Sequence, residues 1–97
     1  MMKLNIGNIF NREENKANGV SELIEEILKI KDEDEMEDFL KGILTPKELM
    51  ELPNRLRIIK MLKKGVSQAE IASKLKVGIA TVTRGSKELQ EGRFKNA

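Results

Sequence analysis

Residues 79–87, IATVTRGSK, carry the side chains with the clearest chemistry in this chain. If the segment is a helix, one of its faces bears methyl, hydroxyl and ammonium groups, from Ile79, Ala80, Thr81, Thr83 and Lys87. Hydroxyl and cationic groups hydrogen-bond phosphates and base edges, and apolar groups contact the thymine methyl. We therefore expect this face to contact DNA, with Ile79, Ala80 and Thr83 at the bases and Ile79 as a candidate for a thymine methyl.

The pair Arg84–Gly85 adds a second kind of chemistry to the same segment. Val82 and Leu89 lie on the inward face of the expected helix, and Gly85 falls between them, where a branched apolar residue is usual. Glycine inside a helix costs about 1 kcal/mol relative to alanine. Two interpretations stay open: close packing against a neighbouring helix, or a hole that forms a ligand slot beside Arg84.

The element that must position these residues extends from Ser67 to Leu89. Ser67 and Glu70 have the spacing of a capping box for a first helix, and Val77-Gly78 provides a turn before a second helix begins at Ile79. The expected inward residues are apolar: Ile71, Ala72, Leu75, Val77, Val82 and Leu89. This pattern predicts a helix-turn-helix. Gln68, at the start of the first helix, is expected to hold phosphate together with Lys63 or Lys64.

Two amphipathic helices are expected before this element. Val20, Leu23, Ile24, Ile27 and Leu28 form one helical face, with Ser21 as a plausible cap. After an acidic bridge, residues 32–38, a second stripe of Met36, Phe39, Leu40 and Ile43 ends near Gly42. A chain of 97 residues has little surface to cover both stripes. We assign residues 19–43 to a subunit interface, intertwined with a second copy; the alternative is packing within the chain only.

Between the two regions, Thr45-Pro46-Lys47-Glu48 has the form of a capping box with proline at the first helical position. Pro53 is expected to end this helix, and Asn54 to cap another that ends at Lys63-Lys64-Gly65. Residues 44–97 would then be the DNA-binding region with a short tail. Residues 1–18 lack a sustained period and are expected to form a flexible arm.

Composition excludes several classes of function. The chain has no cysteine and no histidine, so neither a thiolate metal site nor the usual general base is present, and we expect no enzyme and no cofactor. No apolar run approaches about 18 residues, which favours a cytoplasmic protein without membrane contact. The net charge is −5 up to Ile43 and +7 from Leu44 onward. Clustered cations beside a helix-turn-helix indicate phosphate binding, although a solvated lysine face is the simpler alternative.

Three motifs resemble the tryptophan repressor family, in its order and at nearly its spacing: LTPKEL at 44–49, NRLRII at 54–59 and GIATVTRGS at 78–86. The resemblance implies an all-α, helix-turn-helix fold in an intertwined homodimer. It also implies a transcriptional repressor that binds a double-stranded DNA operator and is gated by L-tryptophan or a related amino acid. Ligand would set the spacing of two symmetry-related helices that enter successive major grooves, about 34 Å apart.

The resemblance also implies a ligand pocket. Arg84 would bind the tryptophan carboxylate and cover one indole face, Arg55 would cover the other face, and Gly85 would make room. From the opposite subunit, the Thr45 hydroxyl would contact the carboxylate. Backbone carbonyls near Gly42 and Leu44, also from that subunit, would accept from the ammonium.

Three features depart from the family pattern. Glu88 replaces a small hydroxyl residue, and its carboxylate could strengthen an ammonium contact or select another ligand. The segment after Leu89, QEGRFKNA, is too short for the family's final helix, and Ala69 and Ala72 replace basic residues, so the operator is not predictable. Two other functions therefore stay open: a ligand-independent helix-turn-helix regulator whose Arg84 binds phosphate, and a protein-interaction adaptor.

Overall fold

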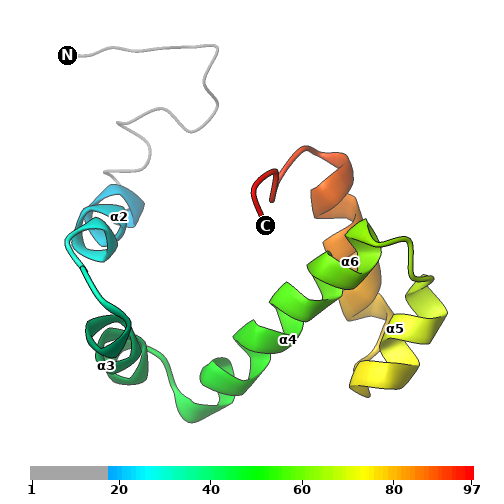
Figure 1. Cartoon of the computed structure of the whole chain (residues 1–97), viewed down its shortest axis with the longest axis horizontal. Coiled ribbons are helices and arrows are strands. Elements are labelled where there is room, and N and C mark those ends of the chain that lie inside the picture. Colours follow the sequence, from blue (N-terminus) through cyan, green and yellow to red (C-terminus); the bar gives the residue numbers. More distant parts are fainter. Residues whose placement is uncertain (1–17) are drawn as a thin grey trace. The chain divides into compact units, whose positions relative to one another are not determined.

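The computed structural model describes residues 18–97, and this part of the chain is built from helices (Figure 1). They are α2 (Val20–Leu28), α3 (Glu33–Ile43), α4 (Pro46–Lys63), α5 (Gln68–Leu75) and α6 (Ile79–Gln90). The predicted all-α class is confirmed. The helices divide into two compact units, with the division between Ile43 and Leu44. The predicted arm lies outside the described residues except for Asn18, and no helix within residues 18–97 could span a membrane.

The first unit contains α2 and α3. Neither helix begins as the sequence predicts. Gly19, in the left-handed conformation at φ 78°, takes the N-cap position of α2, so the prediction of Ser21 as cap is wrong. The acidic bridge is also wrong, because α3 already begins at Glu33. The Asp32 carboxylate accepts from the backbone N–H of Glu35 at 2.8 Å, and acidic side chains in a first turn complement the helix dipole.

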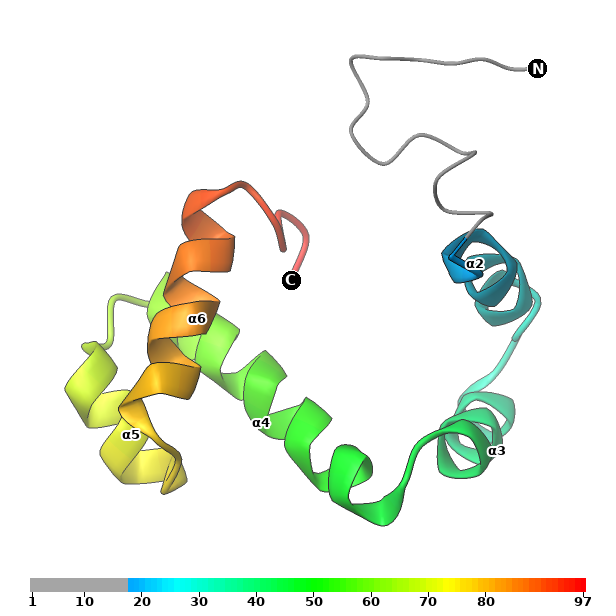
Figure 2. The ribbon, with the colours of Figure 1, turned by 180° about the vertical axis from the view of Figure 1, so that it is seen from behind.

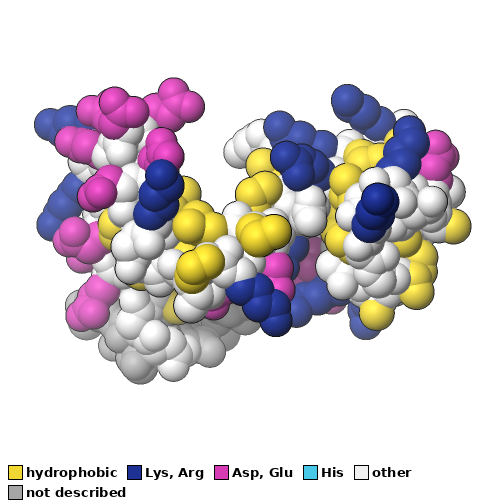
Figure 3. All heavy atoms as spheres, turned by 90° about the horizontal axis from the view of Figure 1, so that it is seen from below, with side chains coloured by type: hydrophobic (Ala, Val, Ile, Leu, Met, Phe, Trp, Pro, Cys, Tyr) yellow, Lys and Arg dark blue, Asp and Glu magenta, His cyan; other side chains and the backbone are white. Residues whose placement is uncertain are grey.

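Charge is segregated between the two units, as Figure 3 shows. Asp and Glu side chains gather over α2 and α3, while Lys and Arg dominate the exposed surface of the second unit. One exposed ion pair on α3 joins Glu37 to Lys41 at 2.8 Å. Its hydrogen bond and its charge lower the pKa of Glu37 and raise that of Lys41. The basic unit is the one that contains the helix-turn-helix segment.

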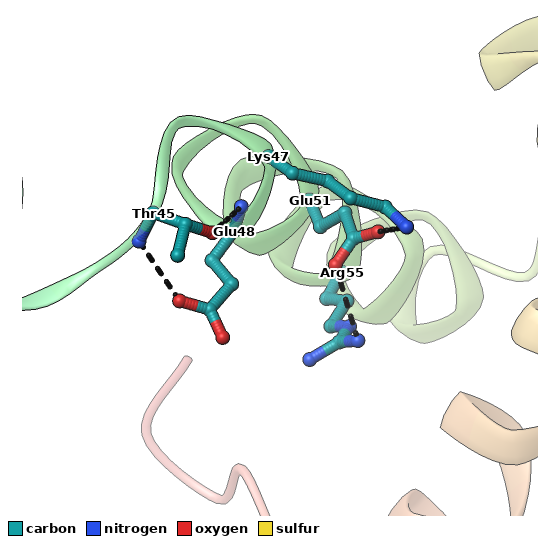
Figure 4. A network of polar contacts seen from close by, with 5 residues as sticks. All are labelled: Thr45, Lys47, Glu48, Glu51 and Arg55. Carbon is teal, nitrogen blue, oxygen red and sulfur yellow. Dashed lines mark hydrogen bonds and ion pairs between the residues drawn. The ribbon is translucent and has the colours of Figure 1, made fainter.

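The start of α4 is the capping box that the sequence predicts. Thr45 Oγ1 accepts from the Glu48 N–H at 3.2 Å, and Glu48 Oε1 accepts from the Thr45 N–H at 2.9 Å (Figure 4). The predicted break at Pro53 is wrong, because α4 continues through Pro53 to Lys63. The cost of one missing N–H is offset by the burial of Ile58 and Ile59 on the same helix.

Asn54 caps no helix, because α4 is continuous there; its Oδ1 instead accepts from Arg57 Nη1 at 3.0 Å. Gly65, just beyond the end of α4, adopts φ 87°, the left-handed conformation expected of it.

Helices α4, α5 and α6 pack against one another around a small core, and Figure 2 shows α5 and α6 beside the later part of α4. Ile58, Ile71 and Val82, one from each helix, are at most 1% exposed. Ser67 Oγ accepts from the Glu70 N–H at 3.2 Å, but the Glu70 carboxylate pairs with Lys74 at 3.6 Å, so only half of that capping box forms. The predicted helix-turn-helix is present in the second unit.

Candidate ligand pocket and DNA-facing helix

A pocket of about 560 Å³ lies in the second unit between α4 and α6. It brings together four of the predicted ligand residues: Arg55 from α4, and Arg84, Gly85 and Glu88 from α6. These residues are about 30 positions apart in the sequence, and only the crossing of the two helices joins them. Gly42, Leu44 and Thr45 do not line this chain's pocket.

Gly85 lies where α6 packs closely against α4. A Cβ atom at this position would be 3.1 Å from Ile58 Cγ2 and 3.2 Å from Ile59 Cδ1. The space in the Cβ direction is therefore already filled, and the close-packing interpretation of this glycine holds. The predicted hole at Gly85 itself is wrong; the pocket begins beside it.

The ionisable groups of the pocket differ in whether another side chain of the described residues pairs with them. Arg55 pairs with Glu51 at 3.7 Å (Figure 4), and Arg93 Nε donates to Glu88 Oε1 at 2.6 Å. Arg84 has no ion pair or side-chain hydrogen bond with any residue of the described range 18–97. An uncompensated guanidinium attracts an anion, and its planar fork matches a carboxylate. Arg84 is therefore the pocket's strongest candidate for an anionic group of a ligand.

Apart from Thr81, the remaining walls of the pocket are apolar. Leu52 and Leu56 of α4 are 40% and 45% exposed, while Ile58 and Ile59 form the deeper, buried part. An apolar wall beside a cation suits a ligand with a flat or branched hydrocarbon body and one carboxylate. The pocket is thus chemically suited to an apolar or aromatic amino acid.

The three ligand residues that the resemblance assigns to a second subunit lie at or next to the connection between α3 and α4. Gly42 lies in the last turn of α3, Leu44 is half-buried in the connection, and Thr45 is the N-cap of α4. In the capping box the Thr45 hydroxyl acts as an acceptor, so its own proton remains available for a carboxylate.

The opposite side of α6 carries the residues predicted to contact DNA. Ile79, Ala80, Thr81, Thr83 and Lys87 are all exposed. Thr81 also lines the pocket, so this residue belongs to both surfaces. Thr83 Oγ1 donates to Gln68 Oε1 at 2.8 Å, which links the two helices of the helix-turn-helix. With its oxygen engaged, Gln68 keeps its amide N–H groups for an acceptor such as a phosphate.

The two predicted phosphate lysines are not equivalent. Lys64 is exposed just beyond α4. Lys63 Nζ donates to the backbone carbonyls of Phe94 and Ala97, the latter at 2.8 Å, and so holds the segment that follows α6. Within the described chain, Lys64 is therefore the better placed of the two for a phosphate.

Comparison with known families decides the class of the chain. The family model described as Trp repressor protein matches residues 18–96. The chain belongs to the Trp repressor family. The family consists of helix-turn-helix transcriptional repressors, so the chain is a regulatory protein of that type rather than an enzyme.

Curated relatives agree with this membership of the Trp repressor family. A Trp operon repressor homolog of Xylella fastidiosa (strain M23) is 40% identical over 75 residues, covering 76% of this chain and 82% of the relative. One of Vibrio campbellii is 41% identical over 70 residues, covering 71% and 70%. One of Vibrio vulnificus (strain YJ016) is 48% identical over 52 residues, covering 53% and 51%. No solved structure matches the chain.

The sequence did not predict several pocket residues of this Trp repressor family member, and two of them come from outside the helices. Arg93 and Phe94 line the pocket from residues 91–97, hereafter the tail. Residue spacing gives no signal for them, because they follow the last helix and reach the pocket only through a chain reversal. The sequence also did not predict the bond between Thr83 and Gln68, because the two residues are 15 positions apart and lie on different helices.

Proposed function

We propose that this chain is a homodimeric, DNA-binding transcriptional repressor whose affinity for its operator is raised by L-tryptophan or a closely related amino acid. One observation carries the proposal: α6 forms a wall of the pocket and also bears the exposed side chains that we expect to contact DNA. Arg84 and Gly85 line the pocket, while Ala80, Thr83 and Lys87 are exposed on the same helix.

The shared helix provides the coupling between ligand and DNA. A ligand held between α4 and α6 fixes the position of α6 relative to the core, and hence the position of its outward side chains. Because a ligand shifts an equilibrium only through its different affinity for two states, tryptophan favours the state in which α6 fits the major groove. DNA binding favours tryptophan binding by the same factor.

Uncovered apolar side chains support the dimer. The helices α2 and α3 have no buried residue, and Leu28 of α2 is 77% exposed. Met50 of α4 is 75% exposed. A folded chain rarely leaves amphipathic helices uncovered, and a second copy would bury them through an isologous interface. The same dimer would bring Thr45, Leu44 and the carbonyl near Gly42 to the partner's pocket.

The charges support an operator as the other partner. Net positive charge is concentrated in residues 44–97, which also contain the helix-turn-helix. Lys64, Gln68 and Lys87 are proposed phosphate contacts, and Ile79, Ala80 and Thr83 are proposed base contacts. Two copies of α6 related by a twofold axis would read half-sites about one helical turn apart.

Titration with L-tryptophan tests the gating. The chain contains neither tryptophan nor tyrosine, so emission from the bound ligand can be followed without protein background. We expect saturable binding of one L-tryptophan per chain, with a matching heat in calorimetry. If millimolar L-tryptophan produces no heat of binding, the gating proposal is rejected, and a ligand-independent regulator is the remaining interpretation.

Thr83→Val is expected to weaken operator binding about fivefold. The substitution keeps the shape of the side chain but removes the hydroxyl that donates to Gln68 Oε1 at 2.8 Å. The loss of one side-chain hydrogen bond is about 1 kcal/mol. Fluorescence anisotropy on an operator selected from a random DNA library measures the effect. Thr83→Ser retains the hydroxyl and serves as the control; equal weakening by both variants would contradict a role of the Thr83 hydroxyl in operator binding.

A further inference from the structure

The tail is folded back by a defined helix end. The N–H of Arg93 bonds to the Glu88 carbonyl at 3.1 Å, and the N–H of Gly92 bonds to the Leu89 carbonyl at 3.0 Å. With Gly92 at φ 94°, this is a Schellman motif, which reverses the chain direction after a helix. The reversal sends residues 93–97 back toward α4 (Figures 1 and 2).

Side-chain contacts hold the tail at two points. Arg93 Nε bonds to Glu88 Oε1 at 2.6 Å, which ties the tail to α6. Lys63 Nζ bonds to the carbonyls of Phe94 and Ala97, which ties the tail to the end of α4. The tail therefore joins the two helices whose crossing forms the pocket.

Phe94 is the apolar member of the tail at the pocket. Its side chain lines the pocket and remains 41% exposed. Its backbone adopts φ 63°, a left-handed conformation that is rare for a bulky residue and needs the surrounding contacts to hold it. The pocket stays open at about 560 Å³ with Phe94 in place, so the ring forms a wall and leaves room for a ligand.

We propose that the tail is the outer wall of the ligand pocket, with Phe94 as a direct contact for an aromatic amino acid and Arg93–Glu88 as the latch that positions it. This inference rests on the proposed ligand gating and extends it to residues 91–97. Phe94 presents an aromatic surface opposite the helix walls, and aromatic rings favour offset or edge-to-face contacts with one another. Ligand and docked tail therefore stabilise each other.

The latch also makes Glu88 a positioning residue for Phe94. Glu88 is the only carboxylate among the pocket-lining residues of the described chain, and its charge is matched by Arg93. Loss of either side chain removes the side-chain bond between the tail and α6, while the backbone bonds of the Schellman motif and the bonds of Lys63 remain. The expected consequence is a Phe94 ring that no longer keeps one position at the pocket.

Binding of L-tryptophan to tail variants of the full chain tests the contact. Phe94→Ala is expected to raise the Kd about tenfold, and Arg93→Gln about threefold. Lys95→Ala changes a tail residue that does not line the pocket, and it should bind like the unsubstituted chain. Unchanged binding by Phe94→Ala would overturn the proposal, and tighter binding would show that the ring blocks the ligand.

A fluorescence measurement without ligand tests whether the tail is docked at the pocket, independently of whether L-tryptophan gates DNA binding. In Phe94→Trp, the single indole reports its surroundings through its emission maximum. We expect a blue-shifted maximum that moves to the red when Arg93→Gln is added. A solvent-like maximum that Arg93→Gln leaves unchanged would show an undocked tail and overturn the proposal. If the unsubstituted chain binds no L-tryptophan, both the proposed gating and the proposed contact between Phe94 and the ligand are wrong. A blue-shifted emission maximum of Phe94→Trp would then show only that the tail packs against the pocket.

Discussion

Arg84→Ala is expected to weaken L-tryptophan binding about a hundredfold. Arg55 and Arg93 are already paired with Glu51 and Glu88, whereas Arg84 has no ion pair with any residue of the described chain. It is therefore the guanidinium that can give its full charge and its hydrogen-bond fork to a carboxylate. Hydrogen bonds to a charged group contribute about 1.5–3 kcal/mol, and about 2.7 kcal/mol corresponds to a hundredfold in Kd.

Two further variants define what Arg84 provides. Arg84→Lys keeps the charge but loses the planar fork, so we expect a loss of about tenfold. Arg57→Ala is the control, since Arg57 is an exposed arginine of α4 that lies outside the pocket and bonds to Asn54. Calorimetry measures all three. If Arg84→Ala binds L-tryptophan normally but lowers DNA affinity without ligand, Arg84 is a phosphate contact and the pocket assignment fails.

Gly85→Val is expected to lower the free energy of unfolding by about 3 kcal/mol. A Cβ at this position would already be 3.1 Å from Ile58 Cγ2 and 3.2 Å from Ile59 Cδ1, and valine adds two methyl groups beyond it. Both isoleucines are buried, so they have little room to move. Overpacking of a core costs about 1–3 kcal/mol, occasionally more, and the modest gain in helix propensity does not offset it.

Gly42→Ala is the matched control for this effect. Gly42 is also inside a helix, but a Cβ there meets nothing within 4 Å. We expect a gain of about 0.5–1 kcal/mol from the lower backbone entropy of the unfolded chain. Urea unfolding followed by far-UV circular dichroism measures both variants, at one protein concentration because the proposed dimer would make the unfolding midpoint depend on concentration. A Gly85→Val chain as stable as the unsubstituted one would contradict the close crossing of α4 and α6.

The helix-turn-helix could be predicted from the sequence because its signals are local. Ser67 caps α5, Gly78 precedes α6, and the apolar spacing places Ile71 and Val82 in the core. Pro53 was misread because a local rule about proline was outweighed by packing at the distant residues Ile58 and Ile59. Local preference is a weak guide where tertiary contacts decide the outcome.

The candidate site was predictable only in part. Arg84 and Gly85 are adjacent in the sequence, and an arginine beside a glycine inside a helix indicates either close packing or a ligand site there. The structure adds which of the arginines has a carboxylate partner, which depends on the rotamers of Glu51 and Glu88. The tail could not be predicted, because the approach of Phe94 to the pocket depends on the turn at Gly92 and on Lys63 some 30 residues earlier.

The most direct test of the account is the affinity of the chain for a selected operator with and without saturating L-tryptophan. Fluorescence anisotropy on one double-stranded DNA, at fixed salt, gives both dissociation constants. Typical coupling energies of 1–3 kcal/mol predict that the ligand tightens DNA binding by about 5- to 150-fold. The same factor should appear when DNA tightens L-tryptophan binding. Equal affinity for the operator with and without a ligand that is demonstrably bound would contradict the coupling through α6.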